Sequence, residues 1–216
     1  MSPSWVLFDL NGTLVDPSGI GEPMGLDASE SLAALDEAVM LAMAETLTGE
    51  WRPLPEFLRA ALLRRARIGG RPDGIDAAME RASRMPPYPD SAAALDRLRR
   101  GGLAAGVLTN SETEAAERAL EAAGLRDRLS LVVGVDEVKA SKPDPRVYQL
   151  GARRAAAPPE EIWMVAAHGW DLLGASRAGM RTAWVARKER YPLETHPRPD
   201  LAGDDLLAVA ELLAAG

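Results

Sequence analysis

From residue 90 onward, short apolar runs alternate with helical patterns, and this alternation constrains the fold more than any other feature. Predicted helices and apolar runs follow one another in pairs, at 91–100 and 104–108, 112–123 and 130–133, 144–155 and 162–165, and 171–178 and 182–185. A last helix is predicted over about 204–214. Strands separated by helices predict a parallel sheet with helices on both faces. The apolar run Trp5–Phe8 is expected to join the same sheet.

The segment between this first strand and the alternating region has a different pattern, which is helical throughout. Two stretches rich in proline and glycine, 17–25 and 85–89, flank helical patterns at about 29–48, 54–68 and 74–84. The first of these helices carries apolar residues on one face, among them Leu35, Val39 and Met43. We therefore expect an α/β core formed by residues 1–14 and 89–216, with a small helical domain, residues 15–88, inserted after the first strand.

Composition excludes several classes of function. The 216 residues include no cysteine, which rules out disulfides, thiolate metal sites and cysteine nucleophiles. A net charge of -7 makes the chain a poor general binder of nucleic acid or of an anionic membrane. No apolar run reaches the ~20 residues of a membrane span, and no secretion signal is recognisable, so the cytoplasm is the expected location. The apolar faces of the inserted helices are compatible with a homodimer interface as well as with an internal core.

Polar side chains follow four of the predicted strands at the point where each strand ends. They are Asp9, Asn11 and Thr13 after the first, Thr109, Asn110 and Ser111 after the second, Asp136, Lys139 and Lys142 after the third, and His168 and Asp171 after the fourth. Ligands of open α/β sheets bind outside the carboxyl ends of the strands. The sequence therefore predicts one pocket, rich in carboxylates and lysine, for a small molecule.

Four segments at these strand ends resemble the motifs of the haloacid dehalogenase superfamily. They are Phe8-Asp9-Leu10-Asn11-Gly12-Thr13-Leu14, Leu108-Thr109-Asn110, Lys142-Pro143-Asp144-Pro145-Arg146-Val147-Tyr148 and Val165-Ala166-Ala167-His168-Gly169-Trp170-Asp171. The fourth has the form used by the 2-haloacid dehalogenases. The resemblance implies a Rossmann-like parallel sheet core with a small helical cap inserted after the first strand, which agrees with the pattern.

The resemblance also implies catalytic roles. Asp9 is the expected nucleophile and forms an aspartyl ester, and Asp171 and His168 are expected to position the water that hydrolyses it. Lys142 is expected to keep Asp9 ionised, which requires its ammonium within ~4–6 Å of the carboxylate. Thr13 completes the predicted catalytic set as a hydrogen-bond donor.

The expected substrate-binding residues surround this set. Thr109 and Asn110 resemble donors to the substrate carboxylate and the nucleophile, and Tyr148 resembles a tyrosine near the same lysine. Leu10 and Asn11, beside the nucleophile, complete the expected substrate-binding residues.

Two positions bear on the reaction and on metal use. Phosphatases of the superfamily carry an aspartate at the position of Asn11 as a general acid and base, and asparagine cannot carry that proton. They also bind Mg²⁺ through an aspartate at the position of Ala167, which here has only a methyl group. We therefore expect no cofactor and no metal. If Mg²⁺ is bound, its ligands would come from Asp9, Asn11 and Asp171.

The chain also departs from the 2-haloacid dehalogenases. The arginine that cradles the halide in that group aligns near Asp36–Ala38, where no arginine stands, and a family serine is replaced by Ala166. Arg52 or Arg59 is a candidate replacement for the arginine. The leading expectation is hydrolytic dehalogenation of short 2-haloalkanoic acids. The alternatives are a Mg²⁺-dependent phosphatase of a small metabolite and a catalytically silent binding protein of the same fold.

Overall fold

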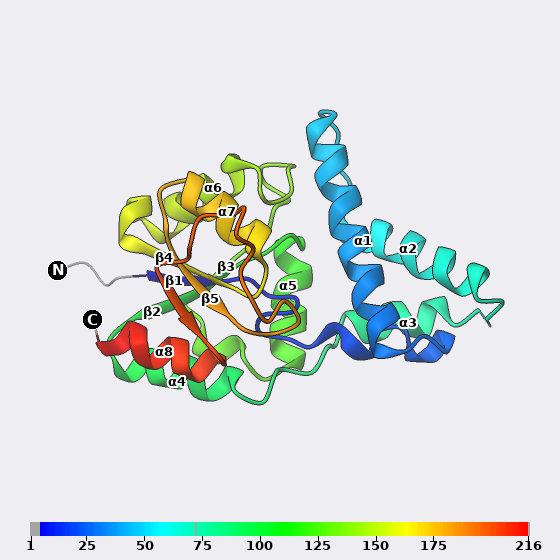
Figure 1. The fold of residues 1–216 in the computed structure, drawn as a ribbon, viewed down its shortest axis with the longest axis horizontal. Coiled ribbons are helices and arrows are strands. Elements are labelled where there is room, and N and C mark those ends of the chain that lie inside the picture. The colour runs from blue at the N-terminus through cyan, green and yellow to red at the C-terminus, as the bar shows by residue number, and fades with distance from the viewer. Residues whose placement is uncertain (1–4, 72, 216) are drawn as a thin grey trace.

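A parallel β-sheet forms the centre of the molecule (Figure 1). The computed structural model describes residues 5–71 and 73–215. Its strands are β1 (Trp5–Phe8), β2 (Ala104–Leu108), β3 (Leu131–Val133), β4 (Ile162–Ala166), β5 (Arg181–Val185) and β6 (Leu201–Gly203). They are ordered β3-β2-β1-β4-β5-β6, and all neighbouring strands are parallel. The predicted α/β class is confirmed.

Helices cover both faces of this sheet, as expected. The first face carries α4 (Ser91–Arg100), α5 (Thr113–Ala122) and α8 (Leu206–Ala215), and the second carries α6 (Pro145–Ala155) and α7 (Gly169–Arg177). Along β1, Val6 and Phe8 pack on the first face and Leu7 packs on the second. A strand that is covered on both sides is apolar at every position, which explains the uninterrupted run in the sequence.

The segment between β1 and β2 forms a three-helix insert that extends to the right of the sheet in Figure 1. It consists of α1 (Ala28–Leu47), α2 (Leu54–Ile68) and α3 (Ile75–Ala82). Helix α1 begins with a capping box. The Asp27 carboxylate accepts a hydrogen bond from the Glu30 amide, and the Glu30 carboxylate accepts one from the Asp27 amide. Buried residues of the insert belong to the same apolar cluster as the first face of the sheet, so the insert is packed against the core.

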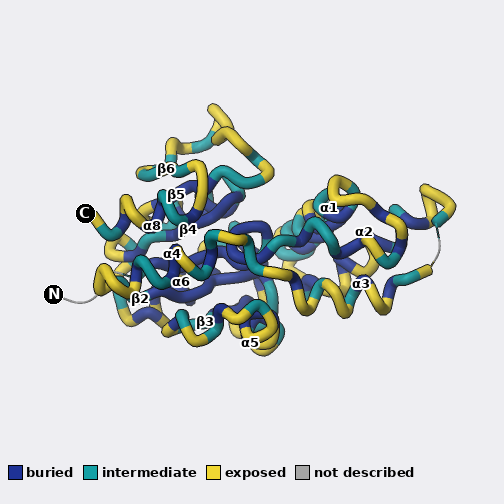
Figure 2. The backbone as a smooth tube through the Cα atoms, turned by 90° about the horizontal axis from the view of Figure 1, so that it is seen from below, coloured by how far each residue is buried: buried dark blue, intermediate teal, exposed yellow. Residues whose placement is uncertain are grey.

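The differences from the predicted elements are small. The strand β6 was not predicted, because its three residues form no apolar run; it extends the sheet by pairing with β5. Four short 3-10 helices also lie in the connections, at Pro17–Gly19, Glu22–Met24, Arg126–Arg128 and Pro159–Glu161. Figure 2 shows the buried strands at the centre and exposed loops around them. No described helix is long and apolar enough to cross a membrane.

The strand order determines where a ligand can bind. The chain continues from β1 to β2 on one side of the sheet and from β4 to β5 on the other, so β1 and β4 flank a topological switch point. Their ends are in register, because Phe8 pairs with Val165 and the amide of Asp9 donates to the Val165 carbonyl at 3.0 Å. A crevice at such a point is the usual ligand site of an open α/β sheet.

Candidate active site

The turn after β1 brings two strand-end loops together. Gly12 has a φ of +82°, which favours glycine, and its amide donates to the Val15 carbonyl at 2.9 Å. A Cβ atom on Gly12 would lie 2.7 Å from Nε2 of His168, a residue of the loop after β4. Glycine is therefore required here both by the backbone conformation and by the close approach of the histidine.

The carboxylate of Asp9 is held by donors on both of its oxygens. The Thr13 hydroxyl donates to Oδ2 at 3.1 Å, and the Lys142 ammonium donates to Oδ1 at 3.3 Å. The Thr13 oxygen also accepts the amide of Ala167 at 3.0 Å, which leaves the hydroxyl proton for Asp9. Asp9 is only 5% exposed, so these donors replace most of its hydration and fix its orientation.

Behind Asp9 lies a buried charge cluster. Lys142 is fully buried, and its Nζ donates to Oδ2 of Asp171 at 2.7 Å as well as to Asp9. The Tyr148 hydroxyl donates to the other Asp171 oxygen at 2.7 Å. Gly174 leaves room for this contact, since a Cβ there would meet the Tyr148 hydroxyl at 2.4 Å. One ammonium thus serves two carboxylates in a water-excluded site.

This environment changes the proton affinities of the cluster. Burial raises the pKa of Asp171, Lys142 opposes the rise, and the negative charge of Asp9 adds to it. The net effect leaves the Asp171 carboxylate a stronger base than an ordinary aspartate. Burial, together with the neighbouring Asp171 charge, raises the pKa of Tyr148 well above its usual value. The tyrosine therefore stays protonated and donates.

Two polar residues follow β2 and face the same region. The Asn110 side-chain oxygen accepts the backbone amide of Lys142 at 2.7 Å, which fixes the orientation of the side-chain amide. Its Nδ2 is buried and has no hydrogen-bond partner among the residues that the structure describes. The Thr109 hydroxyl oxygen accepts the Ser111 amide at 3.2 Å. Asn110 therefore has an unused donor and lines the same cavity as Asp9.

His168 has hydrogen-bond acceptors at both ring nitrogens. Nε2 lies 3.2 Å from the carbonyl oxygen of Asn11, and Nδ1 lies 3.2 Å from the Glu189 carboxylate. Because a carbonyl and a carboxylate only accept, both nitrogens carry protons and the ring is an imidazolium. Burial lowers the pKa of His168, but the Glu189 hydrogen bond and the charge of Asp9 outweigh burial and raise it to about 9. The ring also stacks on Trp170, with centroids 5.5 Å apart.

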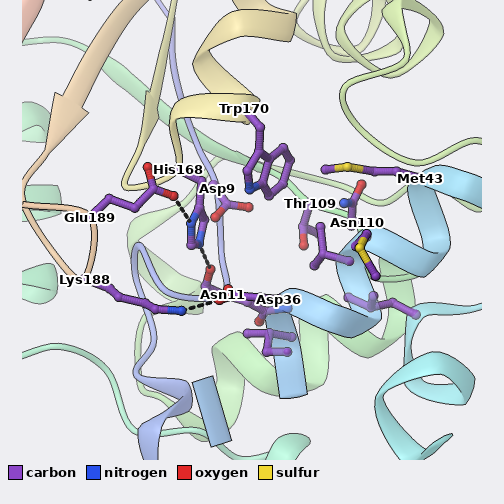
Figure 3. A pocket seen from close by; sticks show the side chains of 14 residues that line it. Asp9, Asn11, Asp36, Met43, Thr109, Asn110, His168, Trp170, Lys188 and Glu189 are labelled. Carbon is purple, nitrogen blue, oxygen red and sulfur yellow. Dashed lines mark hydrogen bonds and ion pairs between the residues drawn. The ribbon is translucent and has the colours of Figure 1, made fainter. Parts of the chain in front are cut away.

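A cavity of about 370 Å³ lies between the strand ends and helix α1, and Figure 3 shows the side chains around it. The core supplies Asp9, Asn11, Thr109, Asn110, His168, Trp170, Lys188 and Glu189. The insert supplies Leu35, Asp36, Val39, Met40, Met43 and Leu54. The cavity thus combines one apolar wall from the insert with a polar wall from the core, as small-molecule sites do.

The predicted site residues fall into three groups. Those that line the cavity are Asp9, Asn11, Thr109, Asn110 and His168. Those that lie behind Asp9 in the buried cluster are Thr13, Lys142, Tyr148 and Asp171. The remaining one, Leu10, lines an adjacent apolar cavity of about 190 Å³, which shares Asn11, Leu35 and Leu54 with the first.

Several lining residues were not predicted. Trp170 belongs to the fourth motif but was not among the predicted site residues, and it lines the cavity. Lys188 and Glu189 come shortly after β5, and the strand-end rule would have found them had it been extended to that strand. Asp36 lies on α1, near where the halide-binding arginine of the 2-haloacid dehalogenases aligns, but it was not itself predicted as a site residue.

The two arginines considered as halide ligands lie elsewhere. Arg52 pairs with Glu45 at 2.8 Å and Arg59 pairs with Asp76 at 2.9 Å, and neither lines the cavity. Within residues 5–71 and 73–215, no three imidazole or carboxylate groups gather as they do in a metal site. Asp9 and Asp171 both contact the Lys142 ammonium, and Ala167 offers only its backbone and a methyl group.

Comparisons with known proteins agree with this geometry. A family model described as haloacid dehalogenase-like hydrolase matches residues 3–179. The (S)-2-haloacid dehalogenase 4A of Burkholderia cepacia is 31% identical over 196 residues, which cover 86% of this chain and 84% of that protein. The phosphoserine phosphatase of Thermus thermophilus is 34% identical over 193 residues, covering 87% and 75%. The crystal structure of the L-2-haloacid dehalogenase RSc1362 superposes with a TM-score of 0.91 at 26% identity, covering 99% of each chain.

Proposed function

The chain belongs to the haloacid dehalogenase-like hydrolases, and from this premise we propose that it hydrolyses the carbon–halogen bond of short 2-haloalkanoic acids. The observation that carries the proposal is the carboxylate of Asp9. It lines the cavity, it is almost removed from water, and donors fix both of its oxygens. A carboxylate oriented in this way is a competent nucleophile toward an adjacent sp³ carbon.

In the first step, an oxygen of Asp9 attacks C2 of the haloacid. A carbon–oxygen bond forms, the carbon–halogen bond breaks, and the halide leaves with the bonding electron pair. A halide leaves without a proton, so this step needs no general acid. Asn11, which cannot supply a proton, is therefore compatible with this step. The Asn110 amide donor and the Thr109 hydroxyl stand ready for the acidic end of the substrate or the departing anion.

In the second step, water attacks the acyl carbon of the Asp9 ester. Asp171 takes the proton of the water, the acyl carbon–oxygen bond breaks, and the same proton passes to the departing alkoxide, which leaves as a 2-hydroxy acid. Burial raises the pKa of Asp171, with Lys142 opposing and Asp9 adding to the rise, and so makes it the better base. Lys142 and Tyr148 hold the Asp171 carboxylate in place. His168, with both N–H groups engaged, contributes positive charge and anchors the Asn11 backbone.

A phosphatase is the second candidate, because a phosphoserine phosphatase is among the relatives. The residues of this site favour it less. Asn11 provides no proton for a leaving alcohol, and Ala167 provides no carboxylate for Mg²⁺. We therefore propose that the reaction requires no metal, and that chloride release is unchanged by a chelator.

The test is a single turnover of L-2-chloropropionate in H₂¹⁸O with the enzyme in excess, followed by mass spectrometry of the peptide that contains Asp9. Label in the Asp9 carboxylate and one chloride released per site would support the proposal, because water attacks the acyl carbon. The Asp9→Asn variant is the control and releases no chloride. An absence of both label and chloride, with Mg²⁺-dependent phosphate release from phosphoserine, would move the assignment to the phosphatase.

A further inference from the structure

The charges around the cavity do not favour an anionic substrate unless one cation is available to it. The acidic lining residues are Asp9, Asp36 and Glu189, and the basic ones are His168 and Lys188. A carboxylate that enters this cavity approaches more negative than positive charge. The neutral donors of Thr109 and Asn110 do not offset this charge, so the carboxylate also needs a cation whose hydrogen-bonding capacity is not already used.

Of the cations Lys142, His168 and Lys188, the first two already have hydrogen-bond partners within the site. The ammonium of Lys142 is fully buried and is shared by Asp9 and Asp171. Both N–H groups of the His168 imidazolium are taken, one by the Asn11 carbonyl and one by Glu189. Lys142 does not line the cavity, so its ammonium does not meet a substrate carboxylate, and His168 binds one only by giving up a hydrogen bond.

Lys188 is the remaining cation. It lies in the loop after β5 on the core side, and it forms an ion pair with Asp36, which comes from α1 of the insert (Figure 3). The side chain of Lys188 is 41% exposed and that of Asp36 is 54% exposed. An ion pair this accessible to water contributes little stability, so a second carboxylate competes for it at low cost. An ammonium also has three donors, and within residues 5–71 and 73–215 Asp36 is the hydrogen-bond partner of Lys188.

We propose that Lys188 binds the carboxylate of the substrate, and that Asp36 competes with the substrate for this ammonium. The inference rests on the proposed function, in which the substrate is a 2-haloacid. It assigns the recognition of substrate charge to a residue of the core rather than to the insert. It also explains how a cavity with an acidic excess admits an acid: the substrate replaces Asp36 beside Lys188.

Two substitutions with opposite expected effects on KM provide the test. Lys188→Met is expected to raise KM for L-2-chloropropionate about fivefold, the upper range for an exposed ion pair, with little change in kcat. Asp36→Asn is expected to lower KM by about twofold to threefold, because it releases Lys188 and removes a repelling charge. Lys188→Arg keeps the charge and should restore most of the affinity. Lys139→Met, at an exposed lysine outside the cavity lining, is the matched control.

Equilibrium binding of propionate and of uncharged propionamide, measured by titration calorimetry, separates this inference from the reaction itself. Weaker binding of propionate to Lys188→Met, with propionamide unaffected, supports the inference even if the wild type releases no chloride. Equal propionate affinity in the wild type and Lys188→Met overturns it, as does the absence of saturable propionate binding to the wild type. Equal weakening of both ligands, or a higher KM in Asp36→Asn, also overturns it, because Lys188 would then act through structure.

Discussion

The two sides of the cavity differ in how firmly their polar groups are held. The floor is defined as Asp9 and the buried cluster behind it, Thr13, Lys142, Tyr148 and Asp171. Every residue of the floor is at most 5% exposed and is hydrogen-bonded to another member. On the rim, defined as the Lys188–Asp36 pair, about half of each side chain is in water. Buried charges must find partners, whereas exposed ones need none. The floor can therefore change little without loss of the fold, while the rim is free to set which substrate is admitted.

Replacing the buried ammonium tests this contrast most severely. Lys142→Met leaves Asp9 and Asp171 buried beside each other without a cation. We expect the free energy of unfolding to fall by about 3–5 kcal/mol, and kcat to fall by roughly a hundredfold or more. Urea unfolding and chloride release measure the two effects. Lys139→Met at an exposed position is the control, and a Lys142→Met protein of wild-type stability would contradict the buried-cluster account.

The next prediction concerns Gly12, in the turn between Asp9 and Thr13 of the floor. Gly12→Ala places a Cβ 2.7 Å from the His168 ring at a φ of +82°. We expect a loss of about 1–3 kcal/mol in unfolding free energy, together with lower kcat, as the ring is displaced. Gly102→Ala is the matched control, because Gly102 has a φ of +77° with open space around its Cβ position. Equal effects of the two variants would show that backbone strain, and not the histidine contact, is responsible.

Removing one hydroxyl sharpens the comparison further. Tyr148→Phe leaves a buried oxygen of Asp171 without its side-chain donor, at a cost of about 1–3 kcal/mol. Because Asp171 serves the second step, we expect the aspartyl ester to accumulate and kcat to fall about tenfold or more. Intact-protein mass spectrometry during turnover detects the ester. Tyr191→Phe, at an exposed tyrosine, should have no effect. Lower kcat without ester accumulation would place Tyr148 in the first step instead.

The floor could be predicted from the sequence because the sheet determines it. Residues that directly follow parallel strands must emerge at one edge, so the strand register places Asp9 of the floor at the same edge as Asn110 and His168 of the cavity lining. Lys142 and Tyr148 were placed by the resemblance of their motif, and the structure puts both beside Asp171. What the sequence did not reveal was that His168 would have acceptors at both nitrogens, because Glu189 arrives from a distant loop.

The rim could not be predicted in the same way. The sequence does predict an apolar face on α1, and Leu35, Val39 and Met43 of that face line the cavity. How the insert packs onto the core decides whether Asp36 also faces the cavity, and helical periodicity contains no information about that packing. The strand β6 escaped prediction for a related reason: its three residues are held by pairing with β5 rather than by an apolar pattern of their own.

The histidine links the floor to the loop that carries the rim, and its protonation should be visible in pH profiles. The folded-state pKa of His168 is raised to about 9, although burial lowers it, because Glu189 and Asp9 outweigh burial. The stabilisation is therefore complete below about pH 6.5, the unfolded value, and is lost as pH rises toward about 9. We expect the unfolding free energy of the wild type to fall over this window by on the order of 3 kcal/mol more than that of His168→Gln. His196→Gln is the control and should keep the wild-type profile.

The smallest effect is expected at the rim, and two adjacent residues allow it to be measured against a neighbour. Arg187 donates to Asp90 at 2.7 Å with both side chains mostly buried, whereas Lys188 pairs with Asp36 in water. We expect Arg187→Met to lower the unfolding free energy by about 1.5–3 kcal/mol, and Lys188→Met to change it by less than about 0.5 kcal/mol. Urea unfolding of both variants at one pH provides the comparison. If Lys188→Met were as destabilising as Arg187→Met, the Lys188–Asp36 pair would be a contact that fastens the insert to the core. Its effect on substrate affinity would then follow from structure and not from charge.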